Sequence, residues 1–222
     1  MKQFNRKTIR RILKPAWFYF IRKSLKPISH RYGMNRGIPI DRYYINKFLL
    51  ENKKYIKGAC LEIRDGRYGQ AYQDQIEKSD ILDIDPQNKN ATIHGDLREL
   101  KVADNTYDCI LLTQVLQYID DIESCIKECH RILKTNGTLF ITVPIMSRLD
   151  PKSLEYYRFT PNRLQFILQS IFKKEKIRVR VFGNILVGRG FWVGQAAEEF
   201  SVKELDHFDP MFPILAAALT VK

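Results

Sequence analysis

The sequence predicts one α/β domain of the doubly wound kind, with a basic segment in front of it. Apolar runs of strand length alternate with helical patterns from about residue 59 onward, which is typical of a parallel sheet with right-handed crossovers. The run Tyr107–Thr113 is apolar almost throughout, as in a central strand that is buried on both faces. A length of 222 residues allows one well-buried core but not two domains of usual size. We place the extension at residues 1–36 and the domain at residues 37–222.

The positive charge of the chain is concentrated at its head. Residues 1–58 contain 16 Lys or Arg but only two acids, Asp41 and Glu51, a balance of +14. The remaining residues contain 21 Lys or Arg against 23 Asp or Glu, a balance of −2. The basicity therefore belongs to the extension and not to the domain.

The extension contains two short amphipathic patterns within residues 5–26, separated by Pro15. Trp17, Phe20 and Ile21 share one helical face, with bases around the rest of the helix. Such a segment is typical of a helix that lies at an anionic membrane surface. It is equally typical of a helix that packs its aromatic residues on its own domain. No nucleic acid is expected as a partner, because no nucleic-acid-binding module is recognisable.

The start of the chain lacks the features of a secretory signal, and no apolar run approaches the length of a membrane span. Four cysteines fit a reducing, cytoplasmic location, with the protein either free or peripheral at the inner membrane face. Cys60 and Cys109 lie in strand-like runs, and Cys125 and Cys129 share an apolar helical stripe. We therefore expect the thiols to pack in the core and expect no metal site.

The first half of the domain should begin with a helix at Pro39–Asp41, with Asp41 as its N-cap. Three strands follow, and a glycine-containing turn with a helix toward Lys78 should connect the first two. The expected strands are Ala59–Ile63, Ile81–Ile84 and Ala91–Ile93.

The second half should contain four further strands and two helices. Gly137 is expected at the C-cap of the first of these helices, and Pro161 in the first turn of the second. The expected strands are Tyr107–Thr113, Thr138–Val143, Ile177–Phe182 and Pro213–Val221; the expected helices are Ile122–Leu133 and Pro161–Phe172.

The loops after the first three strands carry the informative polar residues. In a doubly wound sheet a ligand binds beyond the carboxyl ends of these strands. Glycine in the first loop lets the backbone approach a ligand closely. An acid after the second strand is placed to accept hydrogen bonds from ribose hydroxyls, and an acid after the third can reach an adenine amino group. The stretches that carry these residues are Glu62–Gly69 after the first strand, Asp83–Pro86 after the second and Gly95–Leu97 after the third.

These pieces, in this order, resemble the class I S-adenosylmethionine-dependent methyltransferases, of the type 11 kind associated with glycan biosynthesis. The most specific stretch runs from Tyr107 to Pro144. The resemblance implies a Rossmann-like, three-layer sheet of seven strands, the last antiparallel, and S-adenosylmethionine as the cofactor. It also implies a cofactor site at Glu62, Ile63, Arg64, Gly66, Asp83, Asp85, Asp96, Leu97 and Gln114.

One departure from the family pattern concerns the first loop. Arg64 stands where the family has its first glycine, and Gly69 comes one position late. Arg64 either reshapes the loop and contacts the cofactor, or is solvated while the backbone binds the cofactor.

The acceptor site is less clear from the sequence. The residues after the fourth strand include Gln114, Gln117 and Tyr118 but no histidine that would serve as a base. We assign Tyr118 and Arg158 to the catalytic site; Arg158 either receives an acidic acceptor or pairs locally. Tyr156–Arg158 and the segment Gly183–Pro210, which includes His207, are expected to roof the site. His94 is expected to pack.

Three functions remain open. The first is methyl transfer to a hydroxyl of a sugar or glycan intermediate. The second is a degenerate, non-catalytic domain that binds the membrane or a glycosyltransferase. The third is a dinucleotide oxidoreductase, because Arg64, Gly66 and Gly69 are one residue from the Gly-x-Gly-x-x-Gly fingerprint. The third ranks last, since no substrate domain follows.

Overall fold

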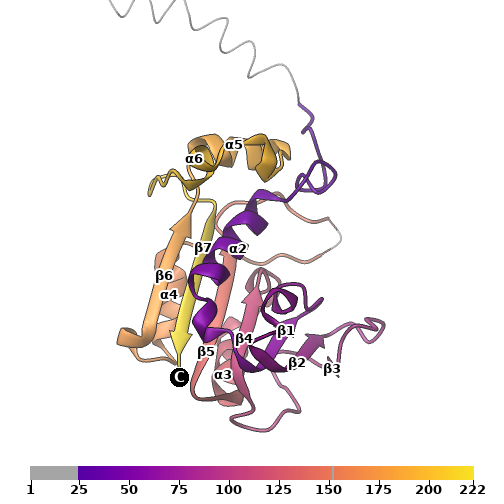
Figure 1. Cartoon of the computed structure of the whole chain (residues 1–222), viewed down its shortest axis with the longest axis vertical. Helices are drawn as coiled ribbons and strands as arrows, with labels where there is room; N and C mark the ends of the chain where they lie inside the picture. The colour runs from indigo at the N-terminus through magenta and orange to yellow at the C-terminus, as the bar shows by residue number, and fades with distance from the viewer. Residues whose placement is uncertain (1–24, 152) are drawn as a thin grey trace, which may run out of the picture.

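The computed structural model describes residues 25–151 and 153–222, and it contains the seven-stranded sheet that the sequence predicts (Figure 1). The strand order is β3-β2-β1-β4-β5-β7-β6. β7 is antiparallel to both of its neighbours, β5 and β6. The other pairs are parallel. The strands are β1 (Gly58–Ile63), β2 (Ile76–Asp83), β3 (Ile93–His94), β4 (Tyr107–Thr113), β5 (Leu133–Pro144), β6 (Ile177–Phe182) and β7 (Leu215–Val221).

Helices cover both faces of the sheet and give it two hydrophobic cores. α2 (Ile40–Glu51) crosses one face and buries Tyr44, Phe48 and Leu49. α3 (Ile122–Ile132) and α4 (Pro161–Gln169) cover the other face. All four cysteines are buried free thiols. Cys60 and Cys109 lie in the core on the α2 side, and Cys125 and Cys129 in the core on the α3 side. The prediction that they pack in the core is therefore confirmed.

Two short helices lie beyond the carboxyl ends of the parallel strands, close to where the described chain begins (Figure 1). They are α5 (Ile185–Val193) and α6 (Val202–Asp206), both inserted between β6 and β7. Residues 25–39 pack against this insertion: the backbone N–H groups of Ile28 and Ser29 both donate to the carbonyl of Val193. Within the described part of the chain, no helix is long and apolar enough to cross a membrane.

The first crossover differs from the prediction. The helix expected toward Lys78 is absent; the twelve residues 64–75 contain only a 3-10 turn, Gly69–Tyr72. β2 begins at Ile76, which pairs with Gly58, so the residues assigned to the end of that helix are strand. Gly66 and Gly69 interrupt the segment and leave too few apolar positions for a helical stripe.

Two helix ends were also predicted wrongly. The N-cap of α2 is Pro39, and Asp41 lies in the first turn. α3 ends at Ile132 and passes directly into β5, so Gly137 is not its C-cap. Gly137 is instead required by close backbone approach, because a Cβ there would lie 2.8 Å from the carbonyl oxygen of Lys134. His94 is exposed on β3, so the prediction that it packs is wrong as well.

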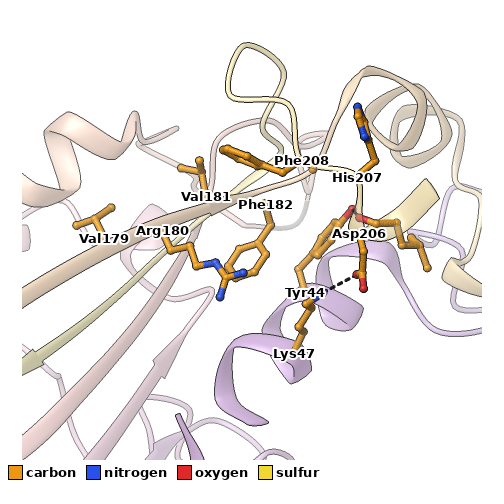
Figure 2. A pocket seen from close by; sticks show the side chains of 11 residues that line it. Tyr44, Lys47, Val179, Arg180, Val181, Phe182, Asp206, His207 and Phe208 are labelled. Carbon is orange, nitrogen blue, oxygen red and sulfur yellow. Dashed lines mark hydrogen bonds and ion pairs between the residues drawn. The ribbon is translucent and has the colours of Figure 1, made fainter. Parts of the chain in front are cut away.

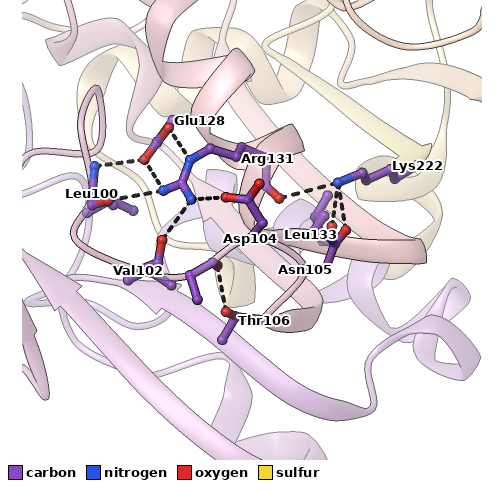
Figure 3. A network of polar contacts seen from close by, with 10 residues as sticks. Leu100, Val102, Asp104, Asn105, Thr106, Glu128, Arg131, Leu133 and Lys222 are labelled. Carbon is purple, nitrogen blue, oxygen red and sulfur yellow. Dashed lines mark hydrogen bonds and ion pairs between the residues drawn. The ribbon is translucent and has the colours of Figure 1, made fainter.

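A network of hydrogen bonds and ion pairs connects α3 to the loop before β4 (Figure 3). The guanidinium of Arg131 donates to Glu128, to Asp104 and to the carbonyls of Leu100 and Val102. Glu128 in turn accepts the backbone N–H of Leu100 at 2.8 Å. These bonds satisfy carbonyls of a loop that has no secondary structure of its own.

Candidate active site

A pocket of about 380 Å³ lies beyond the carboxyl ends of β1, β4 and β5, where a doubly wound sheet binds its ligand. Its volume is in the range of small-molecule sites. The β1 loop contributes Ile63, Arg64, Asp65, Arg67 and Tyr68, and the segment after β4 contributes Thr113, Gln114, Val115, Gln117 and Tyr118.

Glu62 organises the β1 loop rather than lining the pocket. Its buried carboxylate accepts the backbone N–H groups of Tyr68 at 2.9 Å and Gly69 at 2.7 Å. Burial raises the pKa of this carboxyl, and the two backbone hydrogen bonds oppose that shift. The acid therefore holds the turn of the loop.

Arg64 adopts the backbone conformation of a glycine. Its φ is +84°, in the left-handed region that side chains other than glycine disfavour. The loop is held there by the Arg64 N–H, which donates to Leu82, and by the Arg64 carbonyl, which accepts from Asn88. Arg64 is exposed and lines the pocket. The position thus has a backbone shape typical of glycine, while adding a cation at the pocket.

The end of β4 presents unsatisfied amide groups to the pocket. Gln114 has φ +55° and is fixed by its N–H, which donates to the carbonyl of Thr142. The Nε2 of Gln117 donates to the Oε1 of Gln114 at 3.2 Å. The other side-chain atoms of this pair, Gln114 Nε2 and Gln117 Oε1, are buried and find no partner among the described residues. Buried polar atoms of this kind are normally satisfied, so these two amides are candidate contacts for a polar ligand in the pocket that Gln114 and Gln117 line.

The predicted residues after β2 and β3 lie outside the pocket lining. Asp83 accepts from the side chain of Asn88, and Asp85 is exposed and accepts the backbone N–H of Gln87. Asp96 is held by Arg98, which lowers the pKa of its carboxyl. Asn88 also donates to the Arg64 carbonyl, and it thereby joins the β1 loop to the end of β2. Leu97 is buried in the core, and Gly66 packs against Ile81.

Of the two residues assigned to the catalytic site, Tyr118 lines the pocket and Arg158 does not. Burial raises the pKa of the Tyr118 phenol. The guanidinium of Arg158 pairs with Glu155 at 2.5 Å and donates to carbonyls of the β5–α4 loop, including that of Arg148 at 3.2 Å. Arg158 does not line the pocket. Its contacts are those of an arginine that pairs with neighbouring residues, the second of the two roles considered for it from the sequence.

The remaining wall of the pocket comes from the segment before α2, which the sequence did not associate with the site. Tyr32, Asp41 and Arg42 line it, together with Arg148 from the β5–α4 loop. The guanidinium of Arg148 stacks over the Tyr32 ring, 3.9 Å from its centroid. Burial raises the pKa of the Asp41 carboxyl, although it accepts the backbone N–H of Arg42. Nothing in the sequence links these residues to the site, because only the fold brings them to the strand ends.

The insertion Gly183–Pro210 does not line the pocket. It supports the wall indirectly: Pro39 forms a bridge with Ala196, and Gly33 packs against the backbone of Gln195. His207 lies instead in a second pocket, of about 360 Å³, between α2, β6 and α6 (Figure 2). There the Lys47 ammonium is paired with Asp206 at 2.6 Å, and Arg180 is paired with Glu51.

Comparison with protein families finds one match: residues 68–141 match the family described as a methyltransferase domain. No curated protein matches the chain significantly.

Solved structures share the fold at low sequence identity. A SAM-dependent methyltransferase of Archaeoglobus fulgidus is similar with a TM-score of 0.56 and 16% identity, over 82% of this chain and 94% of that one. A SAM-dependent methyltransferase of Thermotoga maritima gives a TM-score of 0.54 and 16% identity, over 96% and 98%. The YcgJ protein of Bacillus subtilis gives 0.53 and 12%, over 81% and 98%.

The pocket lies where the fold places a ligand, and the matched residues 68–141 include the β4 strand and the Gln114–Gln117 pair beside it. The matched domain and the shared fold together support a SAM-dependent methyltransferase and imply S-adenosylmethionine as its cofactor.

Proposed function

We propose that the chain methylates a hydroxyl group of a sugar or glycan intermediate at this pocket. The observation that carries the proposal is the Gln114–Gln117 pair, whose Nε2 and Oε1 atoms are buried at the pocket without a partner among the described residues. A polar ligand that reaches both amides removes the cost of leaving them unsatisfied.

The residues present fit the cofactor at the β1–β4 side of the pocket. Ile63, Arg64 and Asp65 would hold its amino-acid end together with Gln114, while Asp83 and Asp85 would face its ribose at the open edge. When bound, S-adenosylmethionine supplies an electrophilic methyl group on a sulfonium centre. The protein's part is to align the acceptor and exclude water.

A hydroxyl acceptor also needs a group that takes its proton. Asp41 lines the pocket, and burial raises the pKa of its carboxyl, which brings a carboxylate closer to the basicity that general-base catalysis needs at neutral pH. We assign the proton-accepting role to Asp41 and an orienting role to Tyr118. Arg158 would act by fixing Glu155, which itself lines the pocket.

Calorimetry with S-adenosylmethionine and S-adenosylhomocysteine tests the cofactor site. Both ligands should bind the full chain, and Gln114→Met should weaken binding about tenfold because it removes a hydrogen-bonding group. The matched control is Gln169→Met, at an exposed position of α4. No binding of either ligand at millimolar concentration to the unaltered protein would defeat the proposal.

A radiolabelled methyl-transfer assay with a panel of nucleotide sugars and oligosaccharides tests the acceptor. Asp41→Asn should lower turnover by about 10²–10⁴-fold while leaving S-adenosylhomocysteine affinity unchanged. Turnover equal to that of the unaltered protein would exclude Asp41 as the base. Methyl transfer to amines but not to hydroxyls would show that the acceptor is not a hydroxyl group.

The second candidate is a non-catalytic domain that binds the membrane through residues 6–26 or binds a glycosyltransferase. The missing helix after β1 and the position of Asp85 and Asp96 outside the pocket lining favour it. Cofactor binding without turnover on any acceptor, combined with vesicle or glycosyltransferase binding, would support this candidate over methyl transfer.

A further inference from the structure

The insertion between β6 and β7 leaves an apolar surface open at the end of the molecule where the described chain begins. α5 buries Val187, Gly188 and Phe191 on one side. Its other side exposes Ile185, Leu186, Trp192 and Val193, with Trp192 and Ile185 about half exposed at 54% and 51%, and one base, Arg189. The outer side of α5 is therefore mainly apolar, unlike the polar outer face of an ordinary surface helix.

The exposed side of α5 continues into neighbouring segments. At its C-terminal end, Val193 accepts the backbone N–H groups of Ile28 and Ser29, which places exposed Ile28 beside it; Leu25, three residues earlier, is fully exposed. At its N-terminal end, Asn184 donates to the carbonyl of His207. The loop that follows His207 exposes Phe208, Met211 and Phe212. We call the surface formed by Leu25, Ile28, Ile185, Leu186, Trp192, Val193, Phe208, Met211 and Phe212 the apical face.

The sequence that precedes the apical face is strongly basic. Residues 1–24 contain eight Lys or Arg and no acid. The insertion itself carries five acids and two bases, Arg189 and Lys203. Of the acids, Glu199 pairs with Arg36 and Asp206 with Lys47, while Glu198, Glu204 and Asp209 accept backbone N–H groups. Exposed Trp and aliphatic side chains next to a dense run of bases are the features of a protein that lies on an anionic bilayer.

We propose that the apical face docks on an anionic lipid bilayer, with α5 lying in the plane of the interface and Trp192 at the headgroup boundary. The inference adds a second contact to the membrane association considered above for residues 6–26, and it does not depend on methyl transfer. It places the pocket wall formed by Tyr32 and Asp41 next to the membrane, because residues 25–39 pack directly on α5.

Tryptophan fluorescence of the full chain tests the proposal directly. The sequence contains two tryptophans, Trp17 and Trp192, so a Trp17→Phe protein reports from Trp192 alone. Adding vesicles of phosphatidylcholine and phosphatidylserine should shift its emission to shorter wavelength, and brominated lipids in those vesicles should quench it. Vesicles of phosphatidylcholine alone should do neither at physiological salt. The Trp192→Phe protein reports the head segment separately in the same way.

A set of variants locates the contact. Ile185→Ser and Leu186→Ser should each weaken vesicle partitioning about tenfold, because each removes an aliphatic side chain from the interface. Phe166→Ser is the matched control, an exposed aromatic position on α4 away from the apical face, and it should change nothing.

Three results would overturn the proposal. One is an unchanged Trp192 emission while the protein still sediments with anionic vesicles, which would mean that the head segment binds alone. Another is equal response to neutral and anionic vesicles. The last is a Trp192 shift that follows protein concentration without lipid, which would mean that the face joins two copies of the chain.

Discussion

At the scale of single residues, Arg64 combines a glycine-like backbone with a charged side chain at the pocket. Its φ is +84°, in the left-handed region that favours glycine. A non-glycine residue there costs on the order of 1–3 kcal/mol. The strained backbone is held by the hydrogen bonds of the Arg64 N–H to Leu82 and of the Arg64 carbonyl to Asn88.

Arg64→Gly should therefore raise the free energy of unfolding by about 1 kcal/mol, the relief of strain less the entropy of glycine in the unfolded chain. Urea titration measures the change. Asn136→Gly is the control: Asn136 is exposed with φ +65°, but asparagine tolerates this region, so little change is expected. A fall in S-adenosylhomocysteine affinity of the Arg64→Gly protein, by calorimetry, would identify the guanidinium as a ligand contact. A loss of stability would contradict the strain argument.

The carboxyl group of Asp41 gives a pH-dependent prediction. Its folded-state pKa is raised above the ordinary value, so the folded protein binds this proton more tightly than the unfolded chain does. Its stabilising contribution is thus fully present below the ordinary aspartate pKa and is lost as pH rises through the raised pKa. Asp41→Asn should be more stable than the unaltered protein at neutral pH and should lose that advantage in acid. Melting temperatures across pH measure this; an advantage that is independent of pH would contradict it.

At the scale of elements, the sequence predicted most strands and helices because their apolar patterns are long and regular. β4 and β6 have the predicted bounds, and α3 differs by one residue. The helix predicted in the first crossover is absent for a physical reason: the segment 64–75 is short and interrupted by glycine, and Ile76 already pairs with Gly58 in the sheet. The pocket wall from Tyr32 to Arg42 was missed because its contacts with Arg148 join positions more than 100 residues apart.

The Arg131 network makes a prediction about the α3 element. Arg131→Met should lower the free energy of unfolding by about 2–4 kcal/mol, because it leaves the carbonyls of Leu100 and Val102 without this donor and the carboxylate of Glu128 with only the backbone N–H of Leu100. Lys127→Met, on the same helix, removes only an exposed pair with Glu123 and should cost less than about 0.5 kcal/mol. Chemical denaturation of both variants measures the difference. Similar losses for the two would mean that the network is not stabilising.

At the scale of the whole molecule, the boundary predicted between residues 36 and 37 can be tested by truncation. A chain that begins at Met34 loses the hydrogen bonds of Ile28 and Ser29 to Val193 and the stacking of Tyr32 with Arg148. It should be about 1–3 kcal/mol less stable than a chain that begins at Leu25, which lowers the melting temperature by several degrees. Equal melting temperatures would support the predicted boundary and assign residues 25–33 to the extension.

The four buried thiols can report how the two layers of helices detach from the sheet. Cys60 and Cys109 are paired neighbours on β1 and β4 beneath α2, whereas Cys125 and Cys129 lie beneath α3 on the opposite face of the sheet. A thiol reagent can modify each pair only when the layer that covers it detaches. The time courses of modification, resolved by mass spectrometry, would thus tell whether the two layers are released in one cooperative event or one before the other.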